Sequence, residues 1–169
     1  LYVIKSSNKK TNGNMYLVDI NMNVKFIGYN DTKWTDSIFE GEYITETNSF
    51  YIYDSLYVKG NDVRKKKFNQ GLSKRSSNDK TRFEYVEEFL KHDKNIVVNL
   101  EDNNISLNKK SILYSNGENV FEKSKEILDK KDSLNFKIDG IIYIPLNDHY
   151  PIKGGSWHSL LKWKPSEYN

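Results

Sequence analysis

Charged residues near the end of the sequence have the types and the spacing needed to bind phosphate. Asp139 precedes a glycine and an apolar run, and Lys162 and Lys164 lie in the next predicted strand. Residues two apart on a strand point to the same face, so the two lysines project together and Trp163 faces away. A divalent cation prefers hard oxygen ligands such as carboxylate, and phosphate oxygens are bound best by fixed positive charge. The stretch Phe136–Pro165 therefore predicts a pocket for a polyphosphate with its divalent cation.

A second acidic pattern lies in the segment Ile38–Ile44, which reads IFEGEYI. The two-residue period of a strand puts Glu40 and Glu42 on one face and Phe39, Gly41 and Tyr43 on the other. Carboxylates are costly to bury without partners, so one interpretation is a strand whose acidic face meets solvent. The other interpretation is a metal or ribose contact, because the glycine between the two acids permits close approach of a ligand.

An aromatic strand is predicted at Phe50–Tyr57, where Asp54 interrupts a run of apolar and aromatic residues. Tyrosines in such a run are commonly core or sheet-surface residues, and the strand context alone favours that role. The functional alternative is that Tyr53 stacks on a purine base, which any aromatic side chain can do.

Other polar residues give weaker signals. The segment Val63–Asn78 is strongly basic and has no clear period, which predicts either a solvated loop or a contact with RNA or phosphate. None of His92, His149 and His158 has the spacing of a metal-binding motif, so we expect structural or surface roles for them. The sequence contains no glycine-rich phosphate loop of the GxxxxGKS/T or GxGxxG type.

Composition limits the class of protein. The chain has 169 residues, a net charge of +3, and 29% charged against 37% hydrophobic residues. This is enough for one globular domain with a core, and no apolar run is long enough to cross a bilayer. Mild basicity permits a nucleic-acid partner without requiring one. The absence of cysteine excludes disulfides and thiolate metal sites and is typical of a reducing compartment, so we expect a cytoplasmic, non-secreted protein.

Strands far apart in the sequence must come together to position these residues. Alternation and turn residues predict an antiparallel meander at the start, with a hairpin turn at Asn12-Gly13 in the polar loop Ser6–Asn14. We predict one α+β domain with an antiparallel-rich sheet and helices packed on it. The predicted strands are Leu1–Lys5, Met15–Ile20, Val24–Tyr29, Ile38–Ile44, Phe50–Val58, Ile96–Leu100, Phe136–Pro145 and Trp157–Lys164.

Two helices are predicted from local signals. Thr81 with Glu84 has the capping-box spacing of a helix N-terminus, and apolar residues at helical intervals carry this helix to His92. Ser115 with Glu118 repeats the capping-box spacing and predicts a second helix that ends near residue 131.

Four segments occur in an order that resembles a known family. IFEGEY (38–43), FYIYDSLY (50–57), DGIIYIP (139–145) and LLKWKP (160–165) are similar to motifs III, IIIa, IV and V of the covalent nucleotidyltransferases. This superfamily contains the mRNA guanylyltransferases of capping enzymes and the ATP-dependent polynucleotide ligases. Each motif alone is weak evidence, but four in the expected order are specific. The KWKP form resembles the capping branch, and most of all the capping enzymes of large DNA viruses.

The resemblance implies a fold, a reaction and a site. The fold is an incomplete nucleotidyltransferase domain of the ligase type (ATP-grasp-like) that covers residues 1–169. The reaction transfers GMP from GTP, through a lysyl-GMP intermediate, to the 5′-diphosphate end of RNA, with Mg²⁺ or Mn²⁺ as cofactor. The resemblance puts Glu42 near the ribose and the metal, Tyr53 and Ile142 on either side of guanine, Asp139 at the metal, and Lys162 and Lys164 at the phosphates.

The nucleophile is the main departure from the family pattern. Motif I reads K-x-D-G and lies upstream of motif III, and nothing before Ile38 has that form. The one literal match, KIDG at Lys137–Gly140, runs into IIYIP and fits motif IV. We therefore expect a longer protein, with the catalytic lysine just upstream of Leu1, a C-terminal OB-fold domain with motif VI, and further capping domains in the same chain. The segment alone is expected to form no lysyl-GMP adduct.

Two alternative functions and one geometric condition stay open. An ATP-dependent DNA or RNA ligase would share the pocket and differ in the base and the acceptor. A non-catalytic domain of the same fold would bind nucleotide or RNA without chemistry. Strict alternation puts Asp139 and Ile142 on opposite faces of a strand, so both line one pocket only if Gly140 or the sheet twist re-aims the strand. If the protein is viral, we expect it in a viral factory or a virion.

Overall fold

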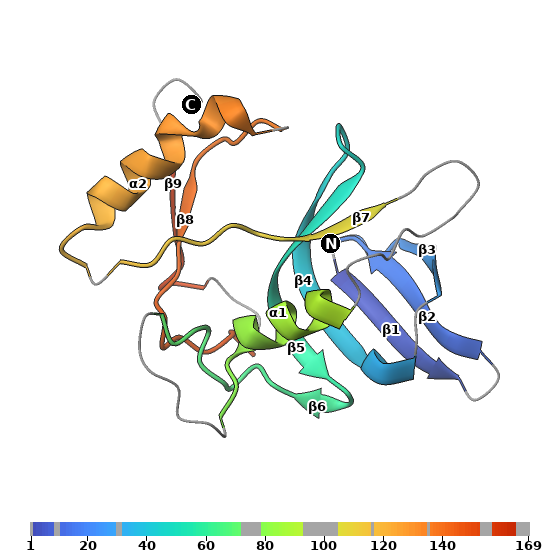
Figure 1. Ribbon diagram of the computed structural model, residues 1–169. Helices are drawn as coiled ribbons and strands as arrows, with labels where there is room; N and C mark the ends of the chain where they lie inside the picture. Colours follow the sequence, from blue (N-terminus) through green and yellow to red (C-terminus); the bar gives the residue numbers. More distant parts are fainter. Residues whose placement is uncertain are drawn as a thin grey trace.

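The computed structural model has the α+β class that the sequence predicts, with mainly antiparallel pairing and two helices among its described residues. Within that part of the chain, a seven-stranded sheet carries helix α1, and a two-stranded sheet lies beside helix α2 (Figure 1). None of the described helices has the length and hydrophobicity needed to span a membrane. The described residues are 2–8, 11–29, 32–71, 79–92, 105–115, 117–134, 136–152 and 157–164.

The large sheet is organised around its longest strand, β5. Its described strands follow the order β3-β2-β1-β4-β5-β6, and β7 pairs with β5 in parallel. Strands β6 and β7 both pair with the edge of β5 that faces away from β4. They share this edge because β7 pairs with the start of β5 and β6 pairs with its end. The strands are β1 (Tyr2–Asn8), β2 (Thr11–Val18), β3 (Val24–Tyr29), β4 (Ser37–Ile44), β5 (Ser49–Val58), β6 (Asn61–Asp62) and β7 (Ser106–Lys109).

The first hairpin is longer than predicted, and the expected turn at Asn12-Gly13 is wrong. Strand β1 continues to Asn8, which pairs with Thr11 at the start of β2, so the predicted turn residues lie inside a strand. The register shifts between Ser6 and Asn8, as at a β-bulge. Backbone pairing satisfies the N–H and C=O groups of this polar segment as well as a local turn would, so the longer ladder prevails.

The core lies between the large sheet and α1 (Arg82–His92), which packs on β5 and β7 (Figure 1). Aromatic rings form its centre: Phe89 of the helix stacks on Phe39 of β4 with a centroid distance of 4.4 Å. The edge of Trp34 meets the Phe89 ring at 5.6 Å. Such pairs add attraction beyond the area they bury, and they fix α1 over the strands that carry the acidic motifs.

The predicted N-terminus of α1 is confirmed in detail. The backbone N–H of Thr81 donates to Glu84 Oε2 at 2.8 Å, and the N–H of Glu84 reaches back to Thr81 Oγ1 at 3.4 Å. These reciprocal bonds are those of a capping box, and they satisfy donors that the first turn of a helix cannot satisfy internally. The helix consequently begins at Arg82, one residue after the cap.

The second capping box is wrong, although its spacing is the same. Helix α2 (Val120–Asp129) begins after Asn119, whose side chain makes no cap bond. Ser115 Oγ instead donates to Asn119 Oδ1 at 2.8 Å and accepts the N–H of Gly117 at 3.0 Å. Gly117 has φ +101°, a conformation that glycine adopts easily, so the chain turns before the helix can start.

The two closing strands are much shorter than predicted. Strand β8 covers Ile141–Tyr143 and β9 covers Leu161–Trp163, and they pair only with each other among the described strands. Pro145 cannot donate to a ladder, and its carbonyl accepts the N–H of Asp148 in a turn. Before β9 the N–H of Leu160 bonds the carbonyl of Trp157, which makes a second turn.

Two further differences concern the segment after α1. The predicted strand Ile96–Leu100 lies outside the described residues. Strand β7 was not predicted, because Ser106–Lys109 is short and polar and has no alternation. Its parallel partner in β5 exists only in the folded chain, so pairing rather than local preference makes it a strand.

Candidate functional site

The β8–β9 sheet brings three of the predicted charged residues into contact. Asp139 Oδ2 lies 3.1 Å from Lys162 Nζ and 2.8 Å from Lys164 Nζ. The alternation of β9 thus turns both lysines to the same side, as expected. The hydrogen bonds from Lys164 and Lys162 lower the pKa of Asp139 to about 2. All three side chains are exposed, so the cluster is an accessible site with a net positive charge.

Ile142 lies on the same face of the small sheet as Lys162. Ile142 is directly opposite Lys162 in the ladder, so the two side chains share a face, and Ile142 is 50% exposed there. Asp139 precedes β8, so strand alternation does not turn it to the other face. A Cβ on Gly140 would lie 2.2 Å from the carbonyl oxygen of Trp163, which only glycine avoids. Glycine at position 140 therefore permits the close approach of β9 next to Asp139.

Glu42 lies in the large sheet and makes a separate ion pair. Its carboxylate accepts a hydrogen bond from Lys110 Nζ at 2.5 Å, and its side chain is 54% exposed. Lys110 Nζ also lies 5.8 Å from the centre of the Phe136 ring, which packs on Tyr51 at 4.9 Å. Tyr51 is the ladder partner of Glu42. The segment that leads to Asp139 therefore runs beside Glu42, although no direct contact joins the two carboxylates.

Tyr53 is placed by a β-bulge and contacts Glu40. The ladder between β4 and β5 shifts between Glu40 and Gly41, which leaves Tyr53 without a partner residue. Tyr53 and Tyr150 both hydrogen-bond the Glu40 carboxylate. Burial raises the pKa of Glu40 and that of Tyr53, so the tyrosine stays a hydrogen-bond donor. Tyr53 is half-buried in the β4–β5 sheet, and Tyr150 brings the loop after β8 onto it.

Asp54, which interrupts an apolar strand in the sequence, finds a buried arginine. Arg82 Nε donates to Asp54 Oδ1 at 2.8 Å, and both side chains are almost completely inaccessible to solvent. Desolvation raises the pKa of Asp54 to about 6, against the lowering effect of the Arg82 hydrogen bond. We did not predict Arg82 as a site residue. The available signal was the aspartate itself, because a carboxylate in a buried strand requires a cationic partner.

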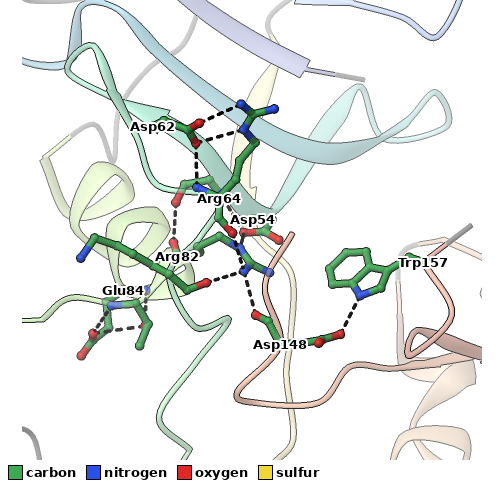
Figure 2. A network of polar contacts seen from close by, with 10 residues as sticks. Asp54, Asp62, Arg64, Arg82, Glu84, Asp148 and Trp157 are labelled. Carbon is green, nitrogen blue, oxygen red and sulfur yellow. Dashed lines mark hydrogen bonds and ion pairs between the residues drawn. The ribbon is translucent and has the colours of Figure 1, made fainter. Parts of the chain in front are cut away.

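Arg82 links the two sheets (Figure 2). Its Nη1 donates to the carbonyl oxygens of Lys66 at 2.6 Å and Asp148 at 2.8 Å. Asp148 lies in the loop between β8 and β9, and the N–H of Tyr150 in that loop donates to the carbonyl of Arg64 at 2.9 Å. Arg64 is paired with Asp62 at 2.7 Å and Lys66 with Asp79 at 2.5 Å, so these two residues of the predicted basic segment are held by acidic partners.

A metal ion would have to be held by few protein ligands. The described part of the chain contains no group of three or more histidine, aspartate or glutamate side chains arranged to hold a metal ion. Glu42 and Asp139 offer exposed carboxylate oxygens, and Mg²⁺ is commonly bound by one or two carboxylates together with substrate phosphates. The donor set therefore fits a cation that arrives with a polyphosphate.

A near match to motif I was missed in the sequence. Lys10-Thr11-Asn12-Gly13 differs from K-x-D-G only by asparagine in place of aspartate, and it precedes motif III. Thr11, Asn12 and Gly13 are the first residues of β2, so the near match overlaps the start of a strand. Lys10 itself lies outside the described residues. A search that allowed the amide form of the acid would have found this position.

Comparison with known families decides the assignment. The model of the mRNA capping enzyme catalytic domain matches residues 4–166, nearly the whole chain. The chain belongs to this family. The reaction of the capping enzyme family is mRNA cap formation by guanylyl transfer, with GTP and the 5′ end of RNA as substrates. No curated protein matches the chain.

Proposed function

We propose that this capping enzyme domain binds GTP through the β8–β9 sheet and transfers GMP to the 5′-diphosphate end of RNA. The observation that carries the proposal is the convergence of Asp139, Ile142, Lys162 and Lys164 on one accessible face. The two lysines neutralise phosphate charge, and Ile142 offers an aliphatic contact for the base. Glu42 and Asp139 would hold Mg²⁺ or Mn²⁺, which supplies charge stabilisation at the phosphates when bound.

The reaction that we propose has two balanced steps. A deprotonated lysine Nζ attacks the α-phosphorus of GTP, the N–P bond forms, and the bond to the bridging oxygen breaks, so that pyrophosphate leaves. A terminal phosphate oxygen of the RNA then attacks the same phosphorus, the N–P bond breaks, and the lysine is released. Lys162 and Lys164 contribute fixed positive charge where negative charge develops.

The attacking lysine has two candidate positions. One is a K-x-D-G lysine upstream of Leu1 in a longer protein, in which case residues 1–169 form no adduct. The other is Lys10, in the near match KTNG. GTP labelled on the α-phosphate, followed by a denaturing gel, separates the two candidates. A covalent band that Lys10→Arg abolishes assigns Lys10, and the absence of a band supports the upstream lysine.

A binding experiment tests the pocket without relying on the nucleophile. We expect Lys162→Met and Lys164→Met each to weaken GTP binding about tenfold, which corresponds to about 1.4 kcal/mol. Lys80→Met is the matched control, because Lys80, which precedes α1, forms an exposed ion pair at 2.6 Å with Glu88 of that helix. Equal GTP affinity in all four proteins would contradict the proposed site.

The two alternative functions give different results. A polynucleotide ligase would prefer ATP to GTP in a competition assay, whereas a capping enzyme prefers GTP. A non-catalytic domain would bind nucleotide but form no adduct even in the longest available form of the protein. These results are independent of the lysine substitutions.

A further inference from the structure

The loop between β8 and β9 is closed on itself by one carboxylate. Trp157 Nε1 donates to Asp148 Oδ2 at 2.7 Å, and Ser159 Oγ donates to the same oxygen. Asp148 follows the end of β8, and the two donors precede the start of β9. One side chain therefore joins the two ends of the connection that brings the lysine strand back to Asp139.

Both ends of this connection are turns, and Asp148 belongs to one of them. The N–H of Asp148 donates to the carbonyl of Pro145 at 3.1 Å. The N–H of Leu160 donates to the carbonyl of Trp157 at 3.1 Å, and β9 begins at the next residue. The position of the second turn therefore sets the register in which β9, and with it Lys162, pairs with β8.

The closed loop is fixed to the buried centre of the large sheet. The carbonyl of Asp148 accepts a hydrogen bond from Arg82 Nη1 at 2.8 Å, and Arg82 is itself held by Asp54. The guanidinium lies 5.9 Å from the centres of both the Tyr150 and the Trp157 rings. Arg82 is completely buried, so this anchor does not move with the exposed surface.

The lysine strand needs such an anchor. Two strands of three residues each, paired only with each other among the described strands, are marginally stable on their own. The lysines are exposed, and exposed ion pairs contribute little to fixing a position. The geometry of the phosphate contacts must therefore come from the ends of the β8–β9 connection.

We propose that Asp148, anchored on Arg82, is a positioning residue that holds Lys162 and Lys164 in place for a polyphosphate ligand. It touches no ligand itself and acts through the turn that precedes β9. This inference rests on the proposed function, because it assumes that the lysines bind phosphate. It identifies the loop that positions the two lysines, and this loop lies outside the four motifs.

The test measures binding of inorganic tripolyphosphate and of GTP by calorimetry. Asp148→Ala is expected to weaken both about fivefold to tenfold. Asp148→Asn, which keeps an acceptor oxygen for Trp157, is expected to recover part of that loss. Asp19→Ala is the matched control. Asp19 also stabilises a turn, because its Oδ1 accepts hydrogen bonds from the N–H groups of Asn21 and Asn23, but this turn joins β2 and β3.

A double-mutant cycle separates positioning from general stability. If Asp148 acts through the two lysines, adding Asp148→Ala to the Lys162→Met/Lys164→Met double variant weakens binding no further. Additive losses, or no loss in Asp148→Ala, overturn the inference. Ser159→Ala, which removes one donor from an exposed residue, tests the same link if Asp148→Ala fails to fold, and unchanged binding in it then overturns the inference. No effect of Lys162→Met itself would instead refute the proposed function.

Discussion

Two of the pairings between an aspartate and basic side chains lie in very different surroundings. Asp54 and Arg82 are almost completely inaccessible to solvent at the centre of the seven-stranded sheet. Asp139, Lys162 and Lys164 are exposed on the two-stranded sheet. The pKa of Asp54 is raised to about 6, because desolvation outweighs the arginine. The pKa of Asp139 is lowered to about 2, because hydrogen bonds from two lysines meet little desolvation.

This difference separates a structural ion pair from one that can exchange its partner. Breaking a buried pair leaves an uncompensated charge, so its partners are committed to each other. An exposed pair is screened by water and contributes little, so a phosphate group can replace the carboxylate at low cost. The same chemistry therefore serves the fold in one region and is available to a ligand in the other.

Removing the buried arginine is expected to have the largest effect. Arg82→Ala leaves Asp54 buried without its partner and removes the hydrogen bonds to Lys66 and Asp148. We expect the free energy of unfolding to fall by about 3 to 5 kcal/mol in urea denaturation at pH 7. Lys80→Ala, which breaks an exposed pair, should cost less than about 1 kcal/mol. Similar losses in both variants would remove the distinction between the two regions.

The pH dependence of stability should differ between the two aspartates. The folded-state pKa of Asp54 lies above its usual value of 3.8, so the folded protein binds this proton more tightly. The contribution of Asp54 is then fully present below about pH 4 and is lost as the pH rises through about 6, by roughly 2 to 3 kcal/mol. Asp54→Asn lacks this decline, so the difference between its unfolding free energy and that of the original protein should change between pH 4 and 7.

Asp139 provides the opposite case for that measurement. Its folded-state pKa is depressed, so its contribution is present above about pH 4 and is lost as the pH falls through about 2. Between pH 4 and 7 the stability curves of Asp139→Asn and the original protein should therefore run parallel. Parallel curves for Asp54→Asn as well would refute the raised pKa of Asp54.

Alanine substitutions at two glycines introduce a steric clash into one sheet or the other. A Cβ on Gly41 would lie 2.6 Å from the carbonyl oxygen of Tyr51, and one on Gly140 would lie 2.2 Å from that of Trp163. We expect Gly41→Ala to lower the free energy of unfolding by about 1 to 3 kcal/mol. Gly140→Ala should mainly separate Asp139 from the lysines, which calorimetry would detect as weaker binding of GTP. A loss of GTP binding in Gly41→Ala alone would place the ligand on the other sheet.

The smallest effect concerns helix capping, where one sequence pattern has two outcomes. Thr81→Ala removes a cap that makes reciprocal bonds with Glu84, and it should cost about 1 kcal/mol. Ser115→Ala removes hydrogen bonds in an exposed turn before α2, and it should cost less than about 0.5 kcal/mol. Thermal unfolding of both variants measures the shift in Tm. Equal shifts would contradict the assignment of Thr81 as the cap of α1.

Local patterns gave the strands β3, β4 and β5 and the start of α1 nearly to the residue, because alternation and capping act within a few positions. They failed where pairing partners decide. Asn12-Gly13 lies in a strand because β1 is there to pair with β2, and Ser106–Lys109 is a strand because β5 offers an edge. The closing strands are short because turns follow Pro145 and precede Leu161.

The sequence by itself determined the α+β class, the motif order and the alternation that turns Lys162 and Lys164 to one side, because these depend on residue type and spacing. Only the tertiary structure decided that Asp139 meets both lysines, that Glu42 pairs instead with Lys110, and that Arg82 buries its charge against Asp54. Each of these contacts joins residues far apart in the chain. Their choice of partner depends on which segments packing brings side by side, and no local pattern records that.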